Sequence, residues 1–153
     1  MAVITLITDS GEADHYVAAI KARIMSVNPG LQVIDISHHI PACDIAHAAF
    51  VLRSVFRDFP KGTVHLVGVH AVGNRGDVPI ALKLEEHYFV GPDNGLLGLV
   101  SEKPHQSLVD LNAVAPIVTT FPERDILAVA AAKLRKRRGN RRTWGSPWPT
   151  FKK

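Results

Sequence analysis

Short apolar runs alternate with helical patterns along the first part of the chain. Residues 3–7 form a β-branched run that Thr8-Asp9-Ser10-Gly11 ends, and apolar residues then recur at helical spacing from position 17 to position 27. Asn28-Pro29-Gly30 ends that helix, and a second apolar run follows at residues 31–36. The pattern predicts a strand–helix–strand unit.

The same alternation continues towards the C-terminus. A second helix is predicted from an apolar face between Ile45 and Phe59, and another apolar strand follows it. Thr120 and Glu123 have the spacing of a capping box, which predicts a helix from Arg124 to about residue 136. The remaining strands are predicted at residues 63–69, 79–84, 87–91 and 107–111.

Strands that are connected through helices favour right-handed crossovers and a largely parallel sheet with helices on both faces. The predicted strands are almost continuously apolar, as is typical of parallel strands that are buried on both sides. We therefore expect an α/β fold, a three-layer α/β/α sandwich around a Rossmann-like sheet. A length of 153 residues predicts one domain.

The composition narrows the class of protein. With 46% hydrophobic and 21% charged residues, the chain is unlike a collagen, a disulfide scaffold or a disordered tail. The single cysteine, Cys43, excludes an internal disulfide framework and a cysteine-based zinc site, and we expect a buried thiol. No secretory signal is visible and the longest nearly apolar stretch is far shorter than the ~20 residues of a membrane span, so we expect a cytoplasmic protein that does not contact a membrane.

The charge is segregated along the chain. Nine of the 18 Lys and Arg residues, none of the 14 Asp and Glu residues and both tryptophans lie from Lys133 onward. We therefore divide the chain into a domain at residues 1–136 and a basic, tryptophan-containing tail at residues 137–153. Three explanations of the tail stay open: a patch that binds nucleic acid, a disordered solvated terminus, and a shifted reading frame.

Candidate chemistry gathers where the strands end. Ligands of an open parallel sheet bind beyond the carboxyl ends of its strands, and the sequence places Asp9, His38 and His70 there, with Asp93 and Asn94 in a later turn. A carboxylate after a first strand suits the two hydroxyls of a ribose, although Asp before Ser-Gly is also a common turn former or helix cap. The same His and Asp side chains leave a metal site as an alternative.

Other motifs are missing from the sequence. There is no G-x-G-x-x-G and no Walker lysine motif, so nothing supports a dinucleotide site or a P-loop. The remaining histidines, His65 and His87 among them, show no ligand spacing, and we expect most of them to be solvated.

Several segments in the same order resemble one family, the S-adenosylmethionine hydroxide adenosyltransferases, relatives of the fluorinases and chlorinases. The resemblance covers roughly residues 3–135. It is carried by Ile4-Thr5-Leu6-Ile7-Thr8-Asp9-Ser10-Gly11, Val33-Ile34-Asp35-Ile36-Ser37-His38, Phe59-Pro60-Lys61-Gly62-Thr63-Val64-His65, Tyr88-Phe89-Val90-Gly91-Pro92-Asp93-Asn94-Gly95, and Thr120-Phe121 with Arg124-Asp125.

The resemblance implies a substrate and a reaction. Members bind S-adenosylmethionine and displace methionine by in-line attack at C5′ of the ribose, with water in the hydrolases and halide in the halogenases. It implies that Asp9, Ser10, Asp93 and Asn94 contact the substrate, that no metal or other cofactor is needed, and that the chain assembles as a homo-oligomer, a trimer in the family. Hydrolysis is expected and halogenation is not, because the halogenase insertion between the fourth and fifth strands is missing.

The chain departs from the family pattern at catalytic positions. The hydrolases orient water with an Asp, an Arg and a His. Here His70 stands in place of the Asp, Arg75 keeps the Arg, and Pro122 replaces the His of a Thr-Phe-His-Gly-Arg-Asp motif. We expect His70 and Arg75 to be the catalytic residues, since an imidazole can orient or deprotonate water.

The family's C-terminal β-rich domain has no counterpart in the sequence, so an impaired, truncated enzyme is one expectation. A non-catalytic nucleoside-binding or nucleic-acid-binding domain is a second reading. A His/Asp metallohydrolase is the third.

Overall fold

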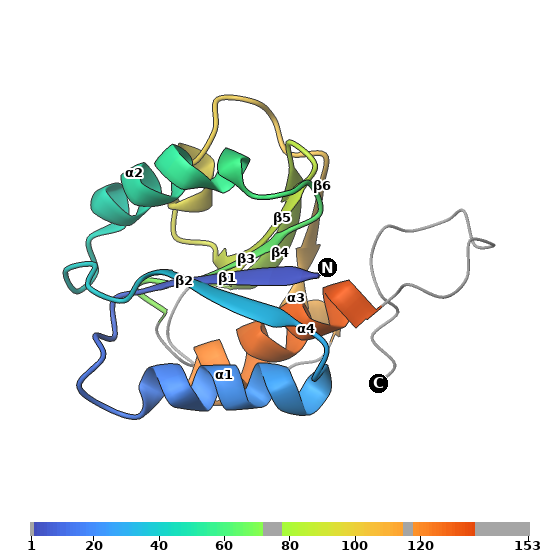
Figure 1. Cartoon of the computed structure of the whole chain (residues 1–153). Helices are drawn as coiled ribbons and strands as arrows, with labels where there is room; N and C mark the ends of the chain where they lie inside the picture. Colours follow the sequence, from blue (N-terminus) through green and yellow to red (C-terminus); the bar gives the residue numbers. More distant parts are fainter. Residues whose placement is uncertain (1, 72–77, 115–117, 137–153) are drawn as a thin grey trace.

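The computed structural model describes residues 2–71, 78–114 and 118–136, and both Arg75 and the tail at 137–153 lie outside these residues. The described residues form a six-stranded sheet with helices on both faces (Figure 1). The strands are β1 Val3–Thr8, β2 Gln32–Ser37, β3 Val64–Gly68, β4 Pro79–Leu84, β5 His87–Pro92 and β6 Ser107–Asp110.

The sheet has the order β2-β1-β3-β5-β4-β6. Strands β2, β1, β3 and β5 run parallel, whereas β4 is antiparallel to both β5 and β6. The largely parallel sheet predicted from the apolar runs is thus confirmed. Because β5 lies beside β3, the carboxyl ends of β1, β3 and β5 are neighbours at one end of the sheet.

The helices form the outer two layers. On one face lie α1, Tyr16–Val27, and α4, Ala128–Lys136; on the other lies α2, Ile45–Val55 (Figure 1). Short helical turns complete the set: η1 Phe56–Asp58, η2 Leu97–Leu99, α3 Leu111–Val114 and η3 Glu123–Leu127. The arrangement confirms the predicted three-layer sandwich.

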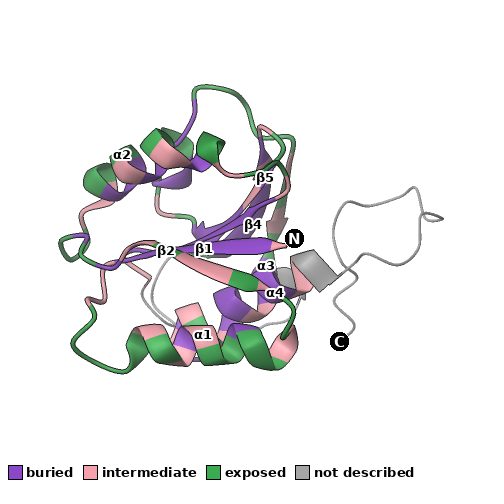
Figure 2. Ribbon diagram, viewed as in Figure 1, coloured by how far each residue is buried: buried purple, intermediate pink, exposed green. Residues whose placement is uncertain are grey.

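Each face of the sheet has its own hydrophobic cluster, because successive side chains of a strand point to opposite faces. Ile4 and Leu6 of β1 join Ile20 and Ile24 of α1 on one face, whereas Ile7 joins Leu52 and Phe56 on the other. Figure 2 shows the buried residues concentrated in the strands and on the inner sides of the helices. Burial of each such side chain stabilises the fold by about 1.5–3 kcal/mol.

One local prediction is wrong. The helix near the C-terminus does not begin with a capping box between Thr120 and Glu123, because its N-cap is Pro122, without a side-chain hydrogen bond. Before the helix, the Thr119 hydroxyl accepts a hydrogen bond from the Phe121 amide (2.9 Å) and donates to Asp125, and the helix opens with the wide turn η3. The side chain of Glu123 is therefore available for other contacts.

The expectation that most of the remaining histidines are solvated is confirmed, because His15, His47 and His105 are exposed. His65 and His87 are the buried exceptions. The Thr5 hydroxyl lies 2.7 Å from Nδ1 of His65, and Nε2 of His65 lies 3.1 Å from Nδ1 of His87. Burial, followed by the neighbouring His87, lowers the pKa of His65 to about 3, so this imidazole is neutral in the folded protein.

Among the described residues, every helix is too short or too polar to span a lipid bilayer.

Candidate functional site

Asp9 directly follows β1 at the end of the sheet where the parallel strands terminate. Its Oδ2 atom accepts hydrogen bonds from the backbone amides of Cys43 (3.0 Å) and His70 (3.1 Å). No described residue donates to Oδ1. One oxygen of the carboxylate is therefore fixed by the backbone and the other is available to a ligand.

The two amides that hold Asp9 come from unusual backbone. Cys43 has φ 61° and His70 has φ 53°, which is the left-handed region that residues other than glycine seldom adopt. Such conformations cost about 1–3 kcal/mol and are concentrated at functional sites. The strained backbone has the same role at both positions, because each amide donates to the same carboxylate oxygen of Asp9.

The structure also corrects the prediction of a buried thiol, because Cys43 is exposed. It lies in the turn before α2, where its left-handed backbone turns the amide towards Asp9.

A chain of hydrogen bonds holds the turn that carries Asp9. Lys21 donates to Oδ2 of Asp35 (2.7 Å), and Oδ1 of Asp35 lies 2.8 Å from Nε2 of the buried His38. Nδ1 of His38 lies 2.7 Å from the hydroxyl of Thr8, which in turn lies 2.9 Å from the hydroxyl of Ser10. The chain therefore joins α1 and β2 to the residues on either side of Asp9.

The direction of these hydrogen bonds follows from the carboxylate at one end. Burial alone would raise the pKa of Asp35, but the hydrogen bonds from Lys21 and His38 lower it below its usual value. An ionised Asp35 only accepts, so Nε2 of His38 donates to it and, in the neutral ring, Nδ1 accepts from Thr8. Ser10 then donates to Thr8, and its remaining lone pairs can accept a hydrogen bond from a ligand.

Of the two predicted residues after β5, the structure brings only Asn94 to this place. The side-chain amide of Asn94 donates to the backbone carbonyl of Val69 (3.0 Å), directly before His70. Asp93 is exposed and lines a separate cavity of about 270 Å³ with Leu97, Ser101 and others. Asp9, Ser10, His70 and Asn94 thus gather at one end of the sheet, whereas Asp93 lies at its edge.

Glu123 is the residue that the sequence patterns failed to place at this site. It begins η3, and its side chain is partly buried against the ends of β1 and β3. Burial raises the pKa of Glu123 to about 7; a hydrogen bond from its own amide opposes the rise and the charge of Asp9 adds to it. The sequence does mark this position as unusual, because Glu123 stands where the family motif Thr-Phe-His-Gly-Arg-Asp has its glycine.

The described residues do not support the alternative of a metal site. Within residues 2–71, 78–114 and 118–136, no three His, Cys, Asp or Glu side chains lie close enough together to hold a metal ion. Adjacent His38 and His39 diverge as extended backbone requires: His38 is buried, and His39 is exposed and pairs with Glu12.

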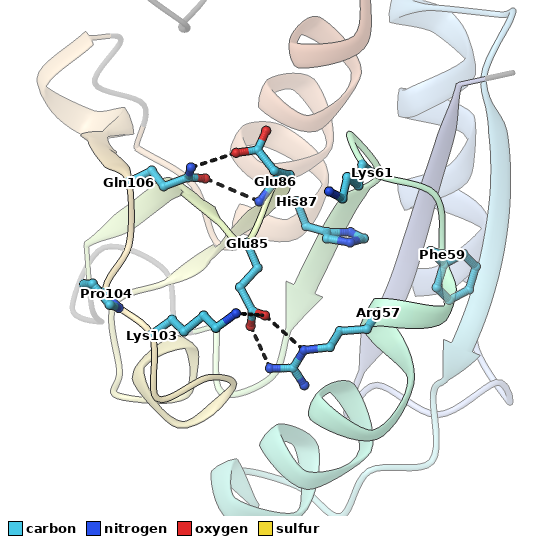
Figure 3. A pocket seen from close by; sticks show the side chains of 9 residues that line it. All are labelled: Arg57, Phe59, Lys61, Glu85, Glu86, His87, Lys103, Pro104 and Gln106. Carbon is cyan, nitrogen blue, oxygen red and sulfur yellow. Dashed lines mark hydrogen bonds and ion pairs between the residues drawn. The ribbon is translucent and has the colours of Figure 1, made fainter.

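The opposite, amino end of the parallel strands has a larger cavity of about 570 Å³ (Figure 3). Several of its charged side chains bind partners within the cavity. Arg57 donates to both carboxylate oxygens of Glu85 (3.1 and 2.6 Å), and Lys103 lies 3.5 Å from the same carboxylate. Gln106 donates to Glu86 (2.7 Å). None of the residues predicted for the site lies in this cavity.

The Asp9 carboxylate, held by two backbone amides, lies beyond β1, next to the point where the strand order reverses, and open α/β sheets bind ligands at this point. Residues 4–143 match the family described as the SAM hydroxide adenosyltransferase N-terminal domain. The chain belongs to this family.

Named relatives and solved structures agree with this assignment. The chain is 36% identical over 140 residues to an (R)-S-adenosyl-L-methionine hydrolase of Methanocaldococcus jannaschii, a match that covers 86% of this chain and 52% of the relative. A fluorinase of an Actinoplanes species is 24% identical over 161 residues and is covered to 54%, with 86% of this chain in the match. The chain spans about half the length of the curated relatives that it matches.

The fold of this family member also matches known structures. A crystal structure of an uncharacterized conserved protein from Thermotoga maritima superposes with a TM-score of 0.75 at 35% identity, over 85% of this chain and 52% of that one. A conserved hypothetical protein of Thermus thermophilus gives a TM-score of 0.71 at 33% identity, over 86% of this chain and 52% of the other.

Proposed function

We propose that this chain binds S-adenosylmethionine at the carboxyl end of its sheet and promotes hydrolysis to adenosine and methionine. One observation carries the proposal: Asp9 has one carboxylate oxygen held by two backbone amides and the other open, beside His70. A carboxylate fixed in this way can accept hydrogen bonds from the 2′- and 3′-hydroxyls of a ribose. The relatives named as S-adenosyl-L-methionine hydrolases support this choice of nucleoside.

In the proposed complex, other side chains of the site also contact the substrate. Ser10 has lone pairs free to accept from the sugar, because its own proton goes to Thr8. Asn94, fixed to the carbonyl of Val69, completes the site, whereas Asp93, which lines a separate cavity, is given no contact with the substrate.

The proposed reaction is a displacement at carbon. The oxygen of water attacks C5′ opposite the sulfur, the C5′–S bond breaks, and its electron pair returns to sulfur, which leaves methionine as a neutral thioether. His70 takes the proton that the water loses and passes it to solvent. The sulfonium is already a good leaving group, so the protein contributes mainly a positioned and desolvated water. We assign that positioning to His70 and Arg75, and the reaction as proposed uses no cofactor.

The proposal extends to the division of the chain and to its assembly. A domain at residues 1–136 carries the nucleoside site, and the tail at 137–153 is a separate segment. A homo-oligomer, a trimer by family resemblance, is the proposed assembly.

Incubation with S-adenosylmethionine, followed by chromatography for adenosine, tests the activity. We expect adenosine to appear with the wild-type chain and to fall by about 10²-fold or more with His70→Ala, the range for loss of an acid–base group. Adenosine release that is unchanged in His70→Ala would contradict the role given to this imidazole.

Pro122 favours one second candidate, a nucleoside-binding domain without chemistry. The proline is buried at the start of η3, where the motif has the family's catalytic histidine, and it can neither donate nor accept a proton. Calorimetric titration with S-adenosylmethionine and adenosine distinguishes the two candidates, since binding without adenosine release would identify the non-catalytic one.

A further inference from the structure

Glu123 brings a second carboxyl group to the end of the sheet where Asp9 lies. Its Cγ atom is 2.9 Å from the point that a Cβ on Gly68 would occupy, and the methyl group of Thr8 is 3.3 Å from the same point. Thr8 and Gly68 are partners in the register of β1 and β3. The stem of Glu123 therefore uses the room left by a glycine, directly over the last paired residues of these strands.

Among the described residues, the charges around Glu123 do not neutralise it. Asp9, at the end of β1, acts on Glu123, and this charge is of the same sign. On its own element, Arg124 donates to Asp125 (2.7 Å). The site thus carries two carboxyl groups, one of which suffices for a ribose diol.

Both α1 and α4 contact η3, and the cations of α1 are also engaged elsewhere. In α1, Lys21 is bound to Asp35 (2.7 Å), and Arg23 acts on Asp125. Above its pKa of about 7, Glu123 is consequently a partly buried anion next to another anion. A positive charge on a ligand would relieve both the burial and the repulsion.

We propose that Glu123 is a specificity-determining residue, which makes the site prefer nucleosides with a positively charged sulfonium over neutral ones. The inference rests on the proposed function, in which Asp9 holds the ribose. The sulfonium is bonded to C5′ of that ribose, and in the proposed complex it lies close enough to Glu123 for the carboxylate to act on its charge. S-adenosylhomocysteine lacks only the methyl group and the charge, and adenosine lacks the sulfur altogether.

Calorimetric titration of the wild-type chain and Glu123→Gln with these three nucleosides tests the inference. At about pH 8, where Glu123 is ionised, we expect Glu123→Gln to lose about 10-fold or more of its affinity for S-adenosylmethionine. The affinities for S-adenosylhomocysteine and adenosine should change less than about twofold, because neither carries the sulfonium charge. Glu102→Gln is the matched control, since Glu102 is exposed and its partner is Arg53 (3.4 Å).

The pH dependence adds a second readout. In the wild type, the preference for S-adenosylmethionine over S-adenosylhomocysteine should grow as the pH rises through about 7, and in Glu123→Gln it should be flat. The melting temperature gives a readout that is independent of ligand. Glu123→Gln should melt higher than the wild type at about pH 8, because the variant no longer buries an anion.

The outcomes separate the inference from the proposed function. If adenosine binds but the preference for the sulfonium is the same in the wild type and Glu123→Gln, the inference is overturned and the nucleoside site stands. A variant that releases adenosine more slowly, with the preference unchanged, also overturns it. If none of the three nucleosides binds to the wild type, the proposed function fails and this inference fails with it.

Discussion

The carboxylates at the two ends of the central sheet differ in their partners. At the amino end, Glu85 is neutralised by Arg57 and Lys103, and the hydrogen bonds from Arg57 lower its pKa to about 2. At the carboxyl end, the described partners of Asp9 are two backbone amides, and burial raises the pKa of Glu123 to about 7.

The backbone shows a related contrast. At the amino end, the left-handed residues are Glu85 and Glu86, neighbours in the tight hairpin between β4 and β5. Two-residue hairpins demand this conformation, so the strain there has a structural cause. At the carboxyl end, Cys43 and His70 come from different loops and share only the carboxylate to which both amides donate.

This comparison teaches that, among the described residues, spare bonding capacity separates the two ends of the sheet. The cavity of about 570 Å³ is lined by Arg57, Glu85, Glu86 and Gln106, which bond to one another in pairs. The predicted residues lie where polar groups have spare bonding capacity. Unsatisfied carboxyl groups, and not empty volume, distinguish the end of the sheet that we expect to bind a ligand.

The largest effect is expected from Asp9→Asn. Loss of two charge-assisted hydrogen bonds to the ribose should cost about 3 kcal/mol, which is about 100-fold in the affinity for adenosine. The fold should be retained, because the amide oxygen of Asn can still accept from Cys43 and His70. Titration calorimetry measures the first effect and thermal unfolding the second.

Asp58→Asn, an exposed position in η1, is the control for Asp9→Asn. Equal adenosine affinity in Asp9→Asn and Asp58→Asn would show that Asp9 is only a turn former.

The next effect concerns stability at the amino end. His65 is neutral when folded, with a pKa of about 3, whereas an unfolded histidine takes up a proton below about pH 6.5. The unfolded state therefore binds more protons between these two values, and the stability falls as the pH drops below about 6.5. The loss should reach about 2 kcal/mol at about pH 5.

Urea unfolding at about pH 7 and at about pH 5 measures this loss, and His65→Gln should show much less of it because glutamine does not titrate. His39→Gln, whose side chain is 71% exposed, should keep the wild-type pH dependence. If His65→Gln and the wild type lose the same stability, the buried pair of histidines is not the cause.

The sheet could be predicted from the sequence because β1 and β3 are nearly continuous apolar runs that are buried at every position, although β2 is only partly buried. The pattern of apolar runs also predicted that Asp9 and His70 lie close together, because each residue follows a parallel strand and the carboxyl ends of parallel strands lie at the same edge of the sheet. Strand order was not predicted. Placing β5 beside β3, with β4 outside it, depends on pairings that no local pattern encodes.

The parts of the site and core that were missed depend on distant partners. His65 binds residues 60 and 22 positions away, so its burial could not be inferred from the residues around it. Glu123 matched a capping pattern, but no side chain caps this helix, and the room for the Glu123 side chain comes from Gly68 in β3. In each case the decisive neighbour is brought in by the fold.

A smaller effect is expected from Glu85→Gln. Its carboxylate is 13% exposed and accepts two hydrogen bonds from Arg57, so the change should lower the free energy of unfolding by about 1–2 kcal/mol. The contribution should be complete above about pH 4.5 and lost as the pH falls towards 2, because the folded pKa is the lower one.

Glu85→Gln should have the opposite effects to Asp9→Asn. We expect its stability to fall and its affinity for adenosine to stay the same, so both quantities are measured on this variant. Weaker binding of adenosine in Glu85→Gln would mean that the amino-end cavity takes part in recognition, and the distinction between the two ends would be lost.

The smallest effect is expected from Ser10→Ala. The hydrogen-bond chain from Asp35 through His38 and Thr8 makes Ser10 a donor within the protein and leaves its lone pairs to the ligand. Loss of one neutral hydrogen bond should cost about 1 kcal/mol, or about fivefold in adenosine affinity. Ser26→Ala is the control, because that hydroxyl donates to the carbonyl of Arg23 on the exposed side of α1. If titration finds both variants within twofold of the wild type, Ser10 only supports the turn. Asp9 would then be the one residue of the turn after β1 that contacts the sugar.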